Sequence, residues 1–238
     1  MKNQYFADVG DYGKYGLLRF LATRGISIAV NWYLTPDDPS SNDGKFRSYL
    51  NKESYGIYDP DLFHALREIK DIQGFQEQSL IPNAVYYDRL LPIAEGLTRV
   101  EKVTARARWH EQAQKVCEGA SLVFMDPDNG LRDGKPTVRR DAIKFVYASE
   151  ICDYYDAGLD VVYYCHKGRR KPDRWERAKR VMKICRQEAA LMGVTYHRGT
   201  QRSYIFVVHP EREEQYRLSI KAFLETSWKD AFSEEPVV

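Results

Sequence analysis

The sequence has few cysteines and no long apolar segment. Its four cysteines are widely spaced and form no C-x-x-C pair: Cys117, Cys152, Cys165 and Cys185. This spacing argues against a zinc site or a disulfide framework and favours buried thiols in a reducing compartment. No apolar stretch is long enough to cross a bilayer, and the N-terminal residues lack the apolar core of a signal peptide. We therefore expect a cytoplasmic protein that is not embedded in a membrane.

Familiar catalytic and cofactor motifs are also missing. The sequence contains no P-loop, no H-E-x-x-H and no Ser-His-Asp spacing, which disfavours the hydrolase chemistries that depend on them. No G-x-G-x-x-G loop follows the first expected strand, where a dinucleotide-binding domain would carry one. The formal net charge is +2. The overall charge therefore does not attract polyanions, and any nucleic-acid binding must come from local basic clusters.

What the sequence does contain is an alternation of strand and helix patterns, with 43% hydrophobic residues to form a core. This alternation predicts an α/β fold with a Rossmann-like, mostly parallel sheet, an antiparallel C-terminal strand and helices on both faces. We expect one domain over residues 1–238, with a helical insertion at 40–100. The expected strands are 26–34, 84–87, 121–125, 159–165, 194–197 and 203–209, and the expected later helices are 98–118, 148–156, 173–192 and 211–225. The tail from Ser233 is expected to be frayed.

The most informative stretch is Ser121–Gly130, with the sequence Ser-Leu-Val-Phe-Met-Asp-Pro-Asp-Asn-Gly. Leu122–Met125 is an unbroken apolar run, as expected for a strand buried on both faces. The following proline and Asn-Gly pair end the strand in a turn. Asp126, Asp128 and Asn129 therefore gather at the carboxyl end of a buried strand, where open α/β sheets bind ligands. The alternative is a tight turn whose polar side chains cap its own backbone.

A basic tract follows the strand expected at 159–165. It begins directly after His166 and includes Lys167, Arg169, Arg170 and Lys171. Because Lys and Arg neutralise phosphates, this tract favours contact with nucleic acid over the alternative of a solvated helix face. His166 stands at the strand end, where a general base or a base-contacting side chain can lie, although a surface histidine is the commoner case.

The N-terminal region predicts a first helix with Asp11 as its N-cap and Gly25 after its end. Leu17, Leu18 and Leu21 would form its apolar stripe. Lys14 lies on a different turn from that stripe, and most lysines are exposed to solvent.

Two short motifs resemble a known family. Ala7-Asp8-Val9 with Lys14 precedes the strand that ends in Asp126-Pro127, and an apolar last strand precedes Pro210. This order is similar to that of the bacterial methyltransferases that modify an adenine of large-subunit ribosomal RNA with S-adenosylmethionine. Those enzymes have an A-D-V-x-x-K type stretch near the N-terminus and a D-P-P-Y motif at the fourth strand. The resemblance covers most of the chain and implies a methyltransferase-type sheet.

The resemblance implies that Asp126 accepts a hydrogen bond from the target amine. It also implies that Lys14 lies near the active-site mouth, where it would contact nucleic acid. Position 128 is Asp instead of Pro, and position 129 is Asn instead of the aromatic residue that stacks on a flipped base. The D-P-D-N-G-L sequence is similar to that of uncharacterised bacterial and phage proteins.

Three residues stand where the glycine-rich cofactor loop of the family belongs, after the first expected strand. Thr35, Asp37 and Asp38 are therefore the candidates for binding S-adenosylmethionine.

Three hypotheses follow. The first is an S-adenosylmethionine-dependent methyltransferase of nucleic acid, with Asp126, Asp128, Asn129 and His166 at the catalytic site and no bound metal. The second is a metal-dependent nuclease or phosphoesterase in which Asp126 and Asp128 hold Mg²⁺ or Mn²⁺, assisted by Lys144 or His166. The third is a catalytically inactive methyltransferase-like protein that binds nucleic acid. The enzymatic hypotheses require the acidic turn and the basic tract to share a cavity.

Overall fold

A seven-stranded sheet is the centre of the computed structural model, which describes residues 1–38, 46–92, 96–166, 176, 180–183 and 186–237. Its strands are β1 (Ile28–Asn31), β2 (Val85–Tyr87), β3 (Leu122–Met125), β6 (Asp160–His166), β7 (Ala190–Tyr196), β8 (Arg202–Val208) and β9 (Phe232–Glu234). The order across the sheet is β2-β1-β3-β6-β8-β7-β9. The pairings from β2 to β6 are parallel and the others are antiparallel, so only β8 and β9 run against the rest.

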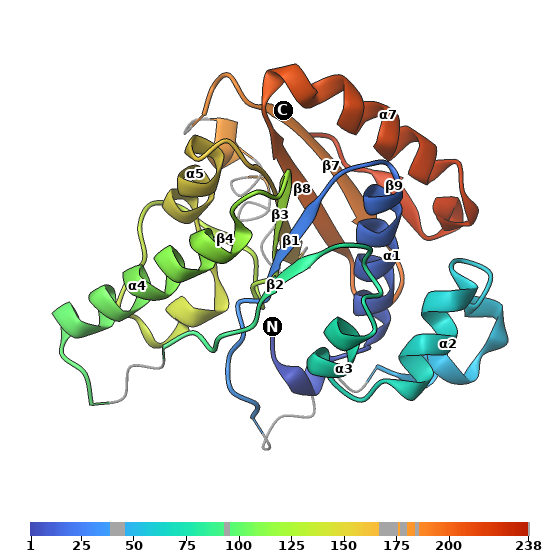
Figure 1. Cartoon of the computed structure of the whole chain (residues 1–238), viewed down its shortest axis with the longest axis horizontal. Coiled ribbons are helices and arrows are strands. Elements are labelled where there is room, and N and C mark those ends of the chain that lie inside the picture. Colours follow the sequence, from blue (N-terminus) through green and yellow to red (C-terminus); the bar gives the residue numbers. More distant parts are fainter. Residues whose placement is uncertain (39–45, 93–95, 167–175, 177–179, 184–185, 238) are drawn as a thin grey trace.

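Helices cover both faces of this sheet (Figure 1). One face carries α1 (Val9–Thr23), α2 (Pro60–Glu68), α3 (Ile72–Glu77) and α7 (Glu213–Leu224). The other carries α4 (Arg99–Cys117) and α5 (Ala148–Asp156). Shorter elements are the 3-10 turns η1 (Asn3–Tyr5), η2 (Ser48–Asn51), η3 (Glu53–Tyr55), η4 (Arg140–Lys144), η5 (Pro210–Arg212) and η6 (Ser227–Asp230), and the parallel pair β4 (Leu131–Arg132) and β5 (Val146–Tyr147).

The central strands contribute to two separate cores because side chains alternate across a sheet. In β3, Leu122 and Phe124 pack with α1, whereas Val123 and Met125 pack with α4 and α5. All four side chains are fully buried. The structure thus confirms the α/β fold, the sheet with antiparallel C-terminal strands and the helices on both faces.

Three expectations about individual elements were wrong. The N-cap of α1 is Asp8, whose Oδ1 accepts from the Asp11 amide at 2.8 Å, so the helix begins before the expected cap at Asp11. Ala190–Tyr196 forms β7, so the helix expected at 173–192 does not extend to residue 192, and residues 173–175, 177–179 and 184–185 of that span lie outside the described residues. The tail from Ser233, expected to be frayed, includes part of β9, because the buried Phe232 anchors this edge strand beside β7.

The region expected to hold a helical insertion, 40–100, contains α2 and α3 between β1 and β2. Asp59 caps α2, and Asp71 caps α3, through side chains that accept from backbone amides of the first turn. Among the described residues no helix has the length and apolarity needed to cross a membrane. Cys117, Cys152 and Cys165 are buried thiols, and Cys185 lies outside the described residues.

The turn after β3 depends on Gly130, whose φ is +99°. A Cβ at this position would lie 2.8 Å from Cys165 Sγ and 3.1 Å from Cys165 Cα on β6. Glycine is therefore required at position 130 for two reasons, its backbone conformation and its close approach to the neighbouring strand. The turn keeps Asp126–Asn129 at the carboxyl edge of the sheet.

We expect Gly130→Ala to lower the free energy of unfolding by about 2–4 kcal/mol, because the added methyl group must displace β6 as well as strain the backbone. Gly134→Ala is the matched control. Gly134 has a φ of +76° and nothing lies within 4 Å of its Cβ position, so the expected loss is about 1 kcal/mol. Urea unfolding of both variants measures the difference, and equal losses would contradict the packing role of Gly130.

Candidate functional site

A cavity of about 340 Å³ lies at the carboxyl ends of β3 and β6. The segment after β3 contributes Asp126, Asp128 and Asn129 to its lining, and the end of β6 contributes His166. The first turns of α1 and the start of β8 form other parts of the wall. This is the edge at which open α/β sheets bind their ligands. The structure thus brings together in one cavity the four residues that the sequence predicted as catalytic.

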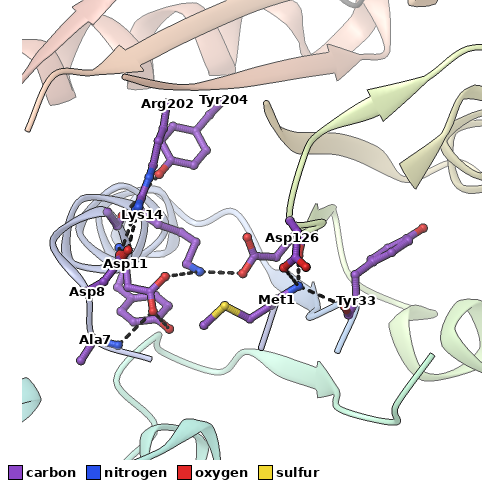
Figure 2. Close-up of polar contacts among 12 residues, drawn as sticks. Met1, Ala7, Asp8, Asp11, Lys14, Tyr33, Asp126, Arg202 and Tyr204 are labelled. Atoms are coloured by element: carbon purple, nitrogen blue, oxygen red, sulfur yellow. Dashed lines mark hydrogen bonds and ion pairs between the residues drawn. The ribbon is translucent and has the colours of Figure 1, made fainter. Parts of the chain in front are cut away.

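Lys14 of α1 reaches the end of β3 in this cavity. Its Nζ lies 2.6 Å from Asp126 Oδ2 and 2.7 Å from Asp11 Oδ1 (Figure 2). Burial works to lower the pKa of Lys14, but the two carboxylates outweigh burial and raise the pKa above its usual range. Lys14 is only 3% exposed, so the general expectation of a solvated surface lysine was wrong. It lines the cavity, and the two nearby carboxylates leave it poorly placed to bind a phosphate.

Asp11 in the cavity wall has a carboxyl group with a raised pKa. Burial, together with the charges of Asp8 and Asp126, raises its pKa to about 6 in spite of Lys14. Its Oδ2 accepts from the Ala7 amide at 2.9 Å. Strongly shifted ionisable groups concentrate at functional sites, because such sites hold charges away from water.

Asp8 is held by Arg202 from β8. The guanidinium donates from Nη1 and Nη2 to the two carboxylate oxygens at 2.9 and 2.7 Å. Burial alone would raise the pKa of Asp8, but the adjacent Arg202 lowers it below its usual value. Gly10 makes this contact possible, because a Cβ at that position would lie 0.8 Å from Arg202 Nη1. The start of α1 and the start of β8 are therefore joined by an ion pair in the cavity wall.

The acidic turn after β3 has a second set of partners at the N-terminus. The Met1 amine donates to the backbone oxygens of Asp126 and Tyr33 at 3.0 and 3.1 Å (Figure 2). It also lies 2.9 Å from Asp128 Oδ1, as an ion pair whose angles do not suit a hydrogen bond. Asn129 is exposed and lines the cavity, and its backbone N–H donates to Lys144 O at 2.8 Å. Turn capping alone therefore does not account for these side chains.

β6, the neighbour of β3 in the sheet, contributes another part of the cavity wall. Tyr164 Oη and His166 Nδ1 lie 3.3 Å apart, and both residues line the cavity. Burial and the nearby Arg202 lower the pKa of His166, so the imidazole is neutral near pH 7. A neutral imidazole can accept a hydrogen bond from a ligand through one ring nitrogen and donate one to it through the other.

The residues predicted to bind a cofactor lie elsewhere. Thr35 is buried, and its N–H donates to Met1 O at 2.9 Å. Asp37 accepts from the Gln4 amide at 2.9 Å, and Asp38 lies 3.9 Å from Lys2 Nζ. None of the three predicted residues lines the cavity. The predicted phosphate contacts Lys167, Arg169, Arg170 and Lys171 lie outside the described residues.

A metal site does not form at these carboxylates in the part of the chain that the structure describes. No group of three or more His, Cys, Asp or Glu side chains is placed to hold an ion. Asp126 is paired with Lys14, and Asp128 lies beside the Met1 amine. Cationic groups thus stand beside both carboxylates of the nuclease hypothesis. Lys144, its proposed assistant, is exposed at the cavity.

Sequence reasoning missed the charged residues Asp8, Asp11 and Arg202 as members of the site. Asp8, Asp11 and Lys14 recur every three residues, so they share one face of α1. That spacing was visible in the sequence. No local pattern in the sequence indicated that Arg202 belongs to the site, because its contact with Asp8 spans 194 positions.

Comparison with known proteins gives no family. No protein-family model matches this sequence, and no curated protein matches it. Among solved structures, protein LPL1258 from Legionella pneumophila, of the family model DUF519, is similar over 97% of this chain and 96% of that chain. The TM-score is 0.48 and the sequence identity is 9%. A similarity at this level carries no argument about function.

We expect Lys14→Met to lower the free energy of unfolding by about 3–5 kcal/mol at pH 7, because two carboxylates are left buried without their cation. The loss should shrink in acid, where the Asp11 carboxylate becomes protonated and no longer needs a cation. Lys115→Met is the matched control. Lys115 forms a solvent-exposed ion pair with Glu111, so this substitution should lower the free energy of unfolding by less than about 1 kcal/mol. Similar losses for the two variants would contradict the buried role of Lys14.

The raised pKa of Asp11 gives a second prediction. Because the folded protein holds this proton more tightly than the unfolded chain, the contribution of Asp11 to stability is present below about pH 4 and is lost as pH rises through about 6. Relative to Asp11→Asn, the wild type should therefore lose roughly 3 kcal/mol of unfolding free energy between pH 4 and pH 7. Denaturant titrations across this range measure the difference, and a relative gain of the wild type with rising pH would contradict it.

Proposed function

We propose that this protein binds single-stranded nucleic acid in the cavity, on a methyltransferase-like scaffold. The observation that carries the proposal is that Asp126, Asp128, Asn129 and His166 line one cavity at the carboxyl edge of the sheet. Amide, carboxylate and imidazole groups are the kinds of side chain that hydrogen-bond to the edges of bases. In the sequence, His166 is followed directly by a basic tract suited to phosphates, which is Lys167, Arg169, Arg170 and Lys171.

Two structural features support the methyltransferase-like scaffold. The strand β8 runs antiparallel between β6 and β7, next to a parallel set, in agreement with the expected mostly parallel sheet that carries an antiparallel C-terminal strand. Lys14 and Asp126, which come from the two motifs of the resemblance, are in contact in the cavity although 112 positions separate them.

The residues predicted to hold S-adenosylmethionine do not fit that cofactor. Residues 1–4 lie along the loop after β1 and use the Thr35 amide and the Asp37 carboxylate for their own contacts. Thr35 is 3% exposed. A methyl-transfer step through Thr35, Asp37 and Asp38 is therefore unsupported, which favours a binding protein over an enzyme that uses the cofactor at this loop.

Methyl transfer from S-adenosylmethionine to nucleic acid is the second candidate. It is favoured by the contact between Lys14 and Asp126, since the resemblance implies that both lie at an active site. The metal-dependent nuclease is not proposed, because each of its two carboxylates lies beside a cationic group.

Binding measurements separate these candidates. Fluorescence anisotropy with short single-stranded RNA and DNA is expected to detect binding that weakens steeply as salt is raised. Calorimetry with S-adenosylmethionine is expected to give no heat. Absence of oligonucleotide binding at low salt would overturn the proposal, and saturable heat with the cofactor would favour methyl transfer instead.

Asn129→Ala is expected to weaken oligonucleotide binding by about tenfold, because a good amide contact to a base contributes about 1–3 kcal/mol. Asn51→Ala is the matched control, since Asn51 is also exposed but does not line the cavity. Unchanged affinity of Asn129→Ala, measured by anisotropy at fixed salt, would place the ligand elsewhere on the molecule.

A further inference from the structure

We propose that Phe46 is the stacking surface for an unpaired base that enters the cavity. This inference rests on the proposed function and names the part of the nucleic acid that the cavity receives. It is carried by the exposure of the Phe46 ring, by its place in the cavity wall and by the way its backbone is anchored.

The Phe46 side chain is 63% exposed, and it lines the cavity. Among the described residues it is the one aromatic side chain that is mostly open to solvent. A phenyl ring has no hydrogen-bonding group, so its exposure to water is unfavourable. A flat π-system of a ligand would cover the ring, and base stacking on aromatic side chains is the common use of such a ring in single-strand binding.

The other aromatic rings of the cavity are less available. Tyr204 is 1% exposed. Tyr164 is half-buried with its hydroxyl against His166, and Tyr5 is half-buried with Lys2 Nζ 5.7 Å from its ring centre. Phe46 is therefore the most exposed of the phenylalanine and tyrosine residues that line the cavity.

The backbone of Phe46 is held in place relative to the polar side chains Asp11, Lys14 and Asp126 of the cavity. Its carbonyl oxygen accepts from the Val9 amide at 3.1 Å, at the first residue of α1. The same helix carries Asp11 and Lys14, and Lys14 is bonded to Asp126. The ring is thus anchored to the element that positions the hydrogen-bonding side chains, so that a base can stack and present its polar edge in one cavity.

The test uses single-stranded oligonucleotides that carry one 2-aminopurine, a base whose fluorescence falls when it stacks. Phe46→Ala is expected to weaken binding about tenfold or more and to abolish the quenching of 2-aminopurine. The slope of log affinity against log salt should not change, because no phosphate contact is removed. Phe46→Trp should retain both affinity and quenching.

Ile57→Ala is the matched control, because Ile57 is also 63% exposed but does not line the cavity. It should bind and quench like the wild type. If the wild type binds and Phe46→Ala binds and quenches equally well, the stacking role is wrong while the proposed function stands. If the wild type binds neither RNA nor DNA, the stacking role and the proposed function are both wrong. A change in the salt slope alone would also overturn stacking, since it would reveal a purely electrostatic effect.

Discussion

The contact between Lys14 and Asp126 is the interaction on which the arrangement of the cavity depends. It ties the face of α1 that carries Asp11 to the end of β3, and both carboxylates are almost removed from water. A buried ion pair contributes little net stability compared with apolar side chains of the same volume, because both ions lose their hydration. Net stability therefore does not explain a group of charges at this edge of the sheet, whereas the positioning of polar groups for the proposed ligand does.

The local parts of the fold followed from the sequence. The helix expected at 148–156 has these bounds, and the one expected at 98–118 spans Arg99–Cys117, where a capping box at Thr98 fixes its start. The Leu122–Met125 strand followed from its apolar run. Signals of this kind lie within a few residues of the element that they define. The edge strand β9 has no such local signal, because its three residues owe their conformation to pairing with β7.

The site was predicted in part for a similar reason. The end of β3 identified Asp126, Asp128 and Asn129, because strand ends and turns are visible in a sequence. The burial of Lys14 was not visible, since its partner lies 112 positions away. The loop at Thr35 was assigned to a cofactor by its position after β1 alone, and no local pattern indicated that residues 1–4 would lie along it.

The close approach of Arg202 to Gly10 has a consequence for sequence comparison. Because the guanidinium occupies the space of a Cβ at residue 10, no larger residue fits at position 10 while Arg202 keeps this contact with Asp8. Chains that share this architecture and keep the arginine should therefore also keep glycine at position 10. Because residues 10 and 202 are far apart in the sequence, this glycine and arginine pair can help to recognise distant relatives whose overall sequence identity is too low for a reliable alignment.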